Sequence, residues 1–298
     1  MIAAYLFLST TYVVTVAGLG GEADYEQRFA QQAAQIETLL KREETVVKTL
    51  SGPAATRQAV GAALAQVAAQ AQPDDTFALI LIGHGTFDGT EYKFNLPGPD
   101  FTASEMAVAI DKIRAGRQLV VNTTSASGAS LHSFQHPKRA VIAATKSGTE
   151  KNAPVFARYF VEALRDPAAD FDKNEVITAL EAYRYADQKT AAYYETQKRL
   201  ATEHPMLEDT GLGDGVRTPS PDNGRGQAAS RFALVKLGAA QIAAATPEKK
   251  ALLAKKEQLE TSIDKLKYQK AAMPQEEYKR TMQALLLELA RLQEEIDK

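Results

Sequence analysis

Short apolar runs alternate with longer segments of helical periodicity over the first 245 residues of the chain. Residues that are apolar at consecutive positions are typical of strands buried on both faces. Such runs lie at Tyr12–Ala17, Phe77–Ile82, Gln118–Asn122 and Arg139–Thr145. Because helical segments separate these strands, the connections are right-handed crossovers and the sheet is mostly parallel. The pattern therefore predicts a three-layer α/β/α sandwich.

The segments between the strands predict the helices that cover this sheet and one long loop. We expect helices at 25–49, 54–71, 102–113, 153–164 and 179–200. The segment Glu203–Gln227 is rich in Gly and Pro, and it predicts a long irregular loop. The segment Phe232–Leu237 predicts a late strand at a sheet edge.

The last part of the chain, residues 246–298, follows a heptad pattern. Thr246-Pro247-Glu248 combines a helix cap, a proline in the first turn and an acidic residue, so it predicts a helix start. A turn at Met273-Pro274 separates two seams of apolar residues: Leu252, Leu259, Ile263 and Leu266, then Tyr278, Met282, Leu285, Leu289, Leu292 and Ile296. We therefore expect an antiparallel coiled-coil hairpin after a sandwich domain at 10–245. Its apolar seam favours protein contact, either self-association or another partner, and packing on its own domain is the alternative.

Composition removes several classes of function. The chain has 35 basic and 37 acidic residues, so its net charge of −2 gives no general attraction to nucleic acid or to an anionic membrane. It has no cysteine, which excludes disulfides, thiolate metal sites and a cysteine nucleophile.

The apolar segment at residues 1–9 is too short to span a membrane and lacks the basic residues of a complete signal peptide. It is either the start of the first strand or the remainder of a signal peptide. We favour an extracytoplasmic location, with which the absence of cysteine is compatible.

Polar residues flanked by small ones follow two of the predicted strands. His84 lies between Gly83 and Gly85, and Ser125 lies in a segment of small residues that ends at Gly128. Ligand sites of open parallel sheets form outside the carboxyl ends of the strands. A His and a Ser at neighbouring strand ends have the chemistry of a base and a nucleophile, although isolated residues of both types are more often structural.

These residues resemble a known family. The order strand, His-Gly, helix, strand, Ser-Gly is similar to the caspase-like fold, above all to legumain-type (C13) cysteine peptidases. The catalytic His of that family lies in a His-Gly pair, and its nucleophile lies in a Glu-Ala-Cys-Glu-Ser-Gly motif. Matching the Ser-Gly at residues 127–128 places Ser125 on the cysteine, 41 residues after His84. The segment Val141–Asn152 is also similar, and the resemblance covers residues 10–240.

This chain departs from the family at the nucleophile, where Ser125 replaces the thiol, and at the specificity acid, where Thr123 stands. A hydroxyl needs a well-placed base, whereas a thiol ionises readily. The resemblance therefore implies a degenerate peptidase that binds a peptide or protein. The alternative is a serine-type endopeptidase in which Ser125 attacks, His84 accepts its proton and the amides of Gly85 and Ser125 hold the oxyanion. An engineered replacement of cysteine is a third reading.

A second candidate site lies at residues 170–181. Asp170, Asp172, Asn174, Val176, Thr178 and Glu181 match the positions of a calcium-binding EF-hand loop that bear ligands. Glu175 stands where such loops have glycine, which weakens the match. An alternative is an ordinary helix start with Thr178 as its cap. The sequence thus requires no cofactor and predicts one structural calcium ion as an option.

Overall fold

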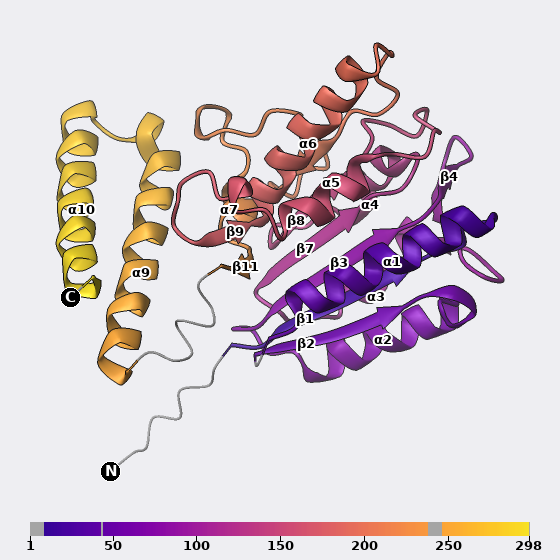
Figure 1. Ribbon diagram of the computed structural model, residues 1–298, viewed down its shortest axis with the longest axis horizontal. Helices are drawn as coiled ribbons and strands as arrows, with labels where there is room; N and C mark the ends of the chain where they lie inside the picture. The colour runs from indigo at the N-terminus through magenta and orange to yellow at the C-terminus, as the bar shows by residue number, and fades with distance from the viewer. Residues whose placement is uncertain (1–8, 43, 238–245, 298) are drawn as a thin grey trace.

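A central sheet of six strands organises the protein, whose computed structural model describes residues 9–42, 44–237 and 246–297 (Figure 1). Its strands are β1 (Thr11–Ala17), β2 (Thr45–Leu50), β3 (Thr76–Ile82), β7 (Arg117–Asn122), β8 (Arg139–Ala143) and β10 (Met206–Glu208). They lie in the order β10-β8-β7-β3-β1-β2, and only β10 is antiparallel to its neighbour. The sheet is therefore mostly parallel, as the buried apolar runs predicted.

Helices cover both faces of the sheet. On one face lie α1 (Ala23–Leu40), α5 (Phe156–Ala163) and α6 (Ala179–Thr196), and on the other α2 (Arg57–Gln70), α3 (Ala103–Ile110) and α4 (Leu131–Phe134). Successive residues of β3 point to opposite faces: Ile80 joins the first core, and Leu79 and Leu81 join the second. Burial on both faces explains why β3 is apolar at every position but the first, and it confirms the three-layer sandwich.

The predicted helix at 25–49 is wrong beyond residue 40. The helix α1 ends at Leu40, and Thr45–Leu50 forms the edge strand β2 beside β1. The sequence of β2 is rich in β-branched residues, and its exposure alternates from one residue to the next. These features favour a strand that is half buried at the sheet edge.

The segment at 203–227 is also more ordered than predicted, because it contains β10. The hydroxyl of Tyr183 donates to the backbone carbonyls of Pro205, directly before β10, and of Arg217, and so holds the two ends of the segment 205–217 together. The late strand exists as β11 (Ala233–Lys236), but it pairs with β9 (Val176–Thr178) in a separate two-stranded sheet. A third sheet, which was not predicted, consists of β4 (Gly85–Phe87), β5 (Tyr92–Phe94) and β6 (Phe101–Thr102).

The C-terminal part forms the predicted hairpin of two helices, α9 (Pro247–Gln269) and α10 (Gln275–Ile296), which lie side by side (Figure 1). Thr246 caps α9 by accepting from the Lys249 N–H. The helix α9 also contacts the sandwich next to the short helix α7 (Gln227–Ser230), where the Ser230 hydroxyl donates to Asp264 over 2.6 Å. The hairpin thus packs on its own domain, and the boundary at 245/246 stays a prediction.

Among the described residues, no helix is both long enough and apolar enough to cross a membrane. The predictions for the N-terminal segment concern residues 1–9, of which residues 1–8 lie outside the described residues. The extracytoplasmic location stays a prediction.

Candidate functional site

The sheet brings the two candidate strand ends together. Strands β3 and β7 are parallel neighbours with Leu81 opposite Asn122, so the residues that follow them leave the sheet at the same edge. Beyond that edge the Gly85 N–H donates to the Ser125 hydroxyl over 3.4 Å. Ser125 is 3% exposed. The structure therefore places the Ser125 hydroxyl against the peptide group that follows His84.

Only glycine fits at position 85. A Cβ atom there would lie 2.6 Å from the Ser125 carbonyl, the Thr124 hydroxyl and the Tyr92 ring. These distances are far below van der Waals contact, so a side chain at 85 would separate the two strand ends. The small residue after His84 thus has a structural reason beside its predicted role as an oxyanion donor.

The half-buried imidazole of His84 packs on α1. Its ring lies 4.7 Å from the ring of Tyr25 and 5.2 Å from that of Phe29, both in edge-to-face geometry. Burial lowers the pKa of His84 from its ordinary value, although a hydrogen bond with the Gly20 backbone opposes this effect. The lowered pKa favours the neutral imidazole at pH 7, the form in which it can accept a proton.

The segment that carries Ser125, residues 123–128, is called here the hydroxyl loop. Asn122 lies beneath it: its side-chain carbonyl accepts from the Thr124 hydroxyl over 2.8 Å and from the Tyr92 hydroxyl over 3.3 Å. Its amide donates to the Ser130 hydroxyl over 3.0 Å. All these groups are buried and uncharged. The network fixes the loop from below without burying a charge.

A second loop braces the hydroxyl loop from the side. Thr145 exchanges hydrogen bonds with Ser127 and accepts from the Gly128 N–H over 2.9 Å. The N–H of Ala126 donates to the Glu150 carbonyl over 2.8 Å. Ala126 is buried and has φ of +56°, a left-handed conformation that costs free energy in a residue with a side chain. The residue directly after Ser125 is thus held in a strained conformation.

Sequence reasoning missed these supporting residues. Asn122 ends the strand directly before the hydroxyl loop, but Tyr92 and the pair Thr145 and Glu150 come from two other segments, and no motif of the sequence assigned these side chains to the support of Ser125. Glu150 in addition bonds the His204 ring over 2.5 Å. Asp88, the acidic residue nearest to His84 in sequence, instead pairs with Lys93 over 2.9 Å and accepts from the Thr90 N–H.

Thr123, which stands at the position of the family's specificity acid, is 3% exposed. Its hydroxyl donates to the Leu81 carbonyl over 2.8 Å. The Thr123 side chain therefore joins the hydroxyl loop to the end of β3.

The second candidate site, the acidic loop, consists of residues 170–178 together with Glu181. Three residues, Asp170, Asp172 and Glu181, each contribute one carboxylate oxygen, and these three oxygens lie within 4.8 Å of one another. Burial raises the pKa of Asp172, and the charge of Asp170 raises it further. The structure thus brings the three predicted carboxylate ligands together.

The same carboxylates hold the backbone of the acidic loop. Asp170 accepts from the N–H groups of Asn174 and Glu175, and Glu181 accepts from those of Phe171 and Thr178. Thr178 caps α6 in a reciprocal box with Glu181. Asn174 uses its side-chain carbonyl to accept from the N–H of Val176. The alternative of a helix cap is therefore confirmed, and calcium binding is left untested.

No family model and no curated protein matches the sequence. Several solved structures are similar in overall arrangement. The Drosophila initiator caspase Dronc is 11% identical with a TM-score of 0.49, over 70% of this chain and 82% of its own. Caspase-1 from Spodoptera frugiperda is 10% identical with a TM-score of 0.48, over 68% and 87%. A secreted C11 cysteine protease from Bacteroides thetaiotaomicron, solved with an irreversible peptide inhibitor, is 10% identical with a TM-score of 0.40, over 63% and 60%.

Proposed function

We propose that this protein is a legumain- or caspase-like peptidase homologue that binds a peptide or protein segment over His84 and Ser125 without cleaving it. The hydrogen bond from the Gly85 N–H to the Ser125 hydroxyl carries the proposal. This bond occupies the amide that an oxyanion would need, and it holds the hydroxyl of a residue that is 3% exposed.

The contacts of His84 support binding over cleavage. Within the described residues, no hydrogen bond joins its imidazole to the Ser125 hydroxyl; the ring instead packs on Tyr25 and Phe29. A serine nucleophile needs a base in direct contact, since its hydroxyl does not ionise at neutral pH. The site therefore has the groups of an acyl-transfer centre in an arrangement that does not activate the hydroxyl.

The alternative, a serine-type endopeptidase with a His84/Ser125 dyad, is favoured by the neutral imidazole, which burial keeps in the form that accepts a proton. Cleavage of a fluorogenic peptide mixture by the natural sequence, abolished in Ser125→Ala, would establish this alternative. Absence of cleavage in both proteins is the result that the binding proposal expects.

The absence of cysteine allows a direct test of the site. In Ser125→Cys the new thiol is the only one in the protein, so alkylation by a peptidyl electrophile reports on position 125 alone. We expect labelling roughly tenfold faster than for a free thiol, because a peptide site over position 125 holds the electrophile beside the thiol. Addition of His84→Asn should remove this difference. The exposed Ser262→Cys is the matched control and should react as a free thiol does.

Two results would contradict the proposal. Equal labelling of Cys variants at positions 125 and 262 by the peptidyl electrophile would show that no peptide site covers Ser125. Labelling that does not change with His84→Asn would remove His84 from the site.

Calcium binding by the acidic loop stays a prediction, and three carboxylate oxygens within 4.8 Å of one another are compatible with it. We expect calcium, but not an equal concentration of magnesium, to raise the melting temperature, and a chelator to reverse the shift. Asp172→Asn should abolish the shift. An unchanged melting temperature in calcium would leave the loop as a helix start alone.

A further inference from the structure

One side of α10 is apolar beyond what its contact with α9 explains, and its Met282 and Leu286 also line the cavity between the hairpin and the sandwich. Leu292 and Ile296 are buried against Leu259 of α9. Leu286 and Leu287, in contrast, are 50% and 52% exposed. From Thr281 to Leu287 no residue carries a charge, so this part of the helix is uncharged on every side. The outer face of a two-helix hairpin is normally polar, and the apolar seam does not account for this stretch.

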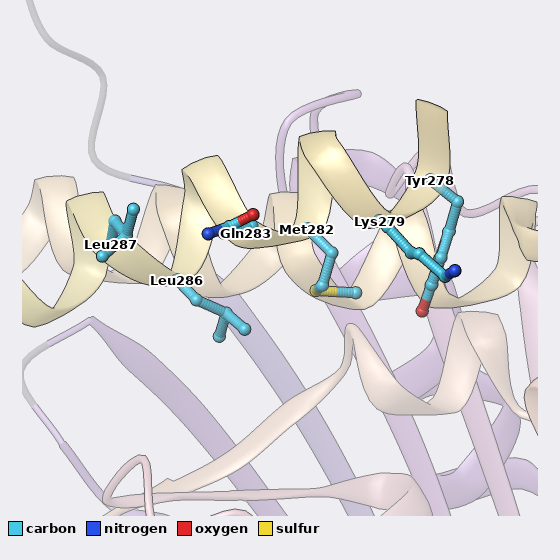
Figure 2. Close-up of a pocket in the computed structure, with 6 residues that line it drawn as sticks. All are labelled: Tyr278, Lys279, Met282, Gln283, Leu286 and Leu287. Atoms are coloured by element: carbon cyan, nitrogen blue, oxygen red, sulfur yellow. The ribbon is translucent and has the colours of Figure 1, made fainter. Parts of the chain in front are cut away.

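Leu286 and Leu287 line a groove along α10 together with four neighbouring side chains, of which Tyr278 and Met282 are half-buried (Figure 2). Its volume is about 390 Å³, and it lies between two rows of side chains with a spacing of four residues: Tyr278, Met282 and Leu286, and Lys279, Gln283 and Leu287. Rows of this spacing are the ridges that pack into the grooves of a neighbouring helix. The shape of the surface therefore suits another α-helix.

The charges on the same side of α10 favour one orientation of a second copy of this helix. Lys279 lies toward the start of this side, and Glu294 lies toward its end, with Gln283, Leu286 and Ala290 between them at helical spacing. Glu276 pairs with Lys279 of its own helix over 3.0 Å. A second α10 in antiparallel orientation sets Lys279 of each copy against Glu294 of the other and Glu276 against Asp297, whereas a parallel one sets every charge on this side against a like charge.

We propose that two copies of this chain associate through antiparallel α10 helices, with Leu286 and Leu287 at the two-fold axis. The contact is self-complementary, since each copy offers the same ridge and the same groove. The two hairpins then form a four-helix arrangement in which α9 keeps its contact with the sandwich. This proposal is independent of the function of the His84/Ser125 site.

Sedimentation of the full chain from about 1 to about 100 µM, the range of weak protein interfaces, tests the proposal. We expect a dimer that Leu286→Lys with Leu287→Lys converts to a monomer. Leu200→Lys and Leu212→Lys are the controls, because these leucines are 90% and 66% exposed on the sandwich. They should leave the dimer intact. Circular dichroism of each variant verifies that the helices persist. A monomeric natural chain, or a dimer that survives the paired leucine substitution, overturns the proposal.

An exchange of charges tests the orientation. Lys279→Glu and Glu294→Lys each create two like-charge contacts in an antiparallel dimer, so each alone should dimerise roughly three- to tenfold more weakly. A mixture of the two variants restores opposite charges at both contacts and should form heterodimers preferentially. Equal dimerisation of the single variants and their mixture rules out the antiparallel contact. A large partner captured only by the natural groove, with no self-association, would show a different protein as its occupant.

Discussion

The hydroxyl loop and the acidic loop are both fixed by side chains that bond to nearby backbone or to one another, but the bonding groups differ in charge. In the hydroxyl loop the groups are neutral and buried, and Asn122 joins Tyr92 to Thr124. In the acidic loop Asp170 and Glu181 accept from N–H groups of their own segment. The first loop therefore depends on close packing between distant segments, and the second on local carboxylates.

This difference predicts that the two loops respond to different kinds of change. A buried network of neutral groups loses free energy when one partner is removed, because the remaining groups are left without hydrogen bonds. It does not respond to pH or salt. A group of carboxylates at 4.8 Å or less responds to protons and cations, and here burial and then the charge of Asp170 raise the pKa of Asp172. The hydroxyl loop should thus be sensitive to changes of shape, and the acidic loop to changes of charge.

The largest effect is expected for Gly128→Ala, which tests the packing of the hydroxyl loop. A Cβ atom at this position would lie 2.3 Å from the backbone of Lys146 and Ser147. The added methyl group should push the hydroxyl loop away from the backbone of Lys146 and Ser147. We expect this to lower the free energy of unfolding, measured by urea denaturation, by about 3 kcal/mol. Gly61→Ala in α2 is the control, because a Cβ atom there meets nothing within 4 Å. It should stabilise the protein by about 0.5–1 kcal/mol. Equal effects of the two substitutions would contradict the packing argument.

Removal of the network beneath Ser125 should have the next largest effect. Asn122→Ala leaves the hydroxyls of Tyr92 and Thr124 without their shared acceptor and should cost about 2 kcal/mol. The exposed Asn152→Ala should change stability by less than about 0.5 kcal/mol. A similarly small change in Asn122→Ala would show that water satisfies the network.

The positions of the main candidate residues could be predicted from local sequence patterns. The apolar runs that became β3 and β7 placed His84 and Ser125 at one edge, because parallel strands end together. The EF-hand template identified Asp170 and Glu181 because the residues of the acidic loop are close together in the sequence. Tyr92 and Thr145 were not predictable, since only the folded chain brings them to Ser125 and a lone hydroxyl has no pattern.

The strands at the two ends of the sheet were not predicted because their sequences lack a clear strand pattern. The short strand β10 and the strand β2 lie at the two ends of the sheet and pair with one neighbour each, and their sequences lack the continuous apolar run of a central strand. In β2 the polar residues Thr45, Lys48 and Thr49 are spaced three and four residues from the first, a spacing that a helix surface also has, so the sequence favours continuation of the preceding helix.

In the acidic loop we expect smaller changes in stability, and one of the two substitutions should stabilise the protein. Glu175 and Lys173 have φ of +65° and +61°, conformations that glycine adopts without cost. Glu175→Gly should therefore raise the free energy of unfolding by up to about 1 kcal/mol, whereas Asp170→Ala should lower it by about 1 kcal/mol through the loss of two N–H partners. Thermal denaturation of both variants measures the two signs. Destabilisation by Glu175→Gly would show that its side chain, rather than its conformation, matters.

The smallest effect concerns His84, the titrating group beside the otherwise neutral hydroxyl loop. Burial lowers its pKa below the ordinary 6.5 in the folded protein. Between these two pKa values the unfolded chain binds a proton that the folded protein does not, so the contribution of His84 lowers stability as the pH falls below about 6.5. His84→Asn should remove this contribution, and its unfolding free energy should fall less steeply from pH 7 to pH 5 than that of the natural sequence. Thr86→Asn, at an exposed neighbouring position, should keep the natural slope. Parallel curves for His84→Asn and the natural sequence would mean that the imidazole is as well solvated in the folded protein as in the unfolded chain, which would also remove the reason for its neutrality at the site.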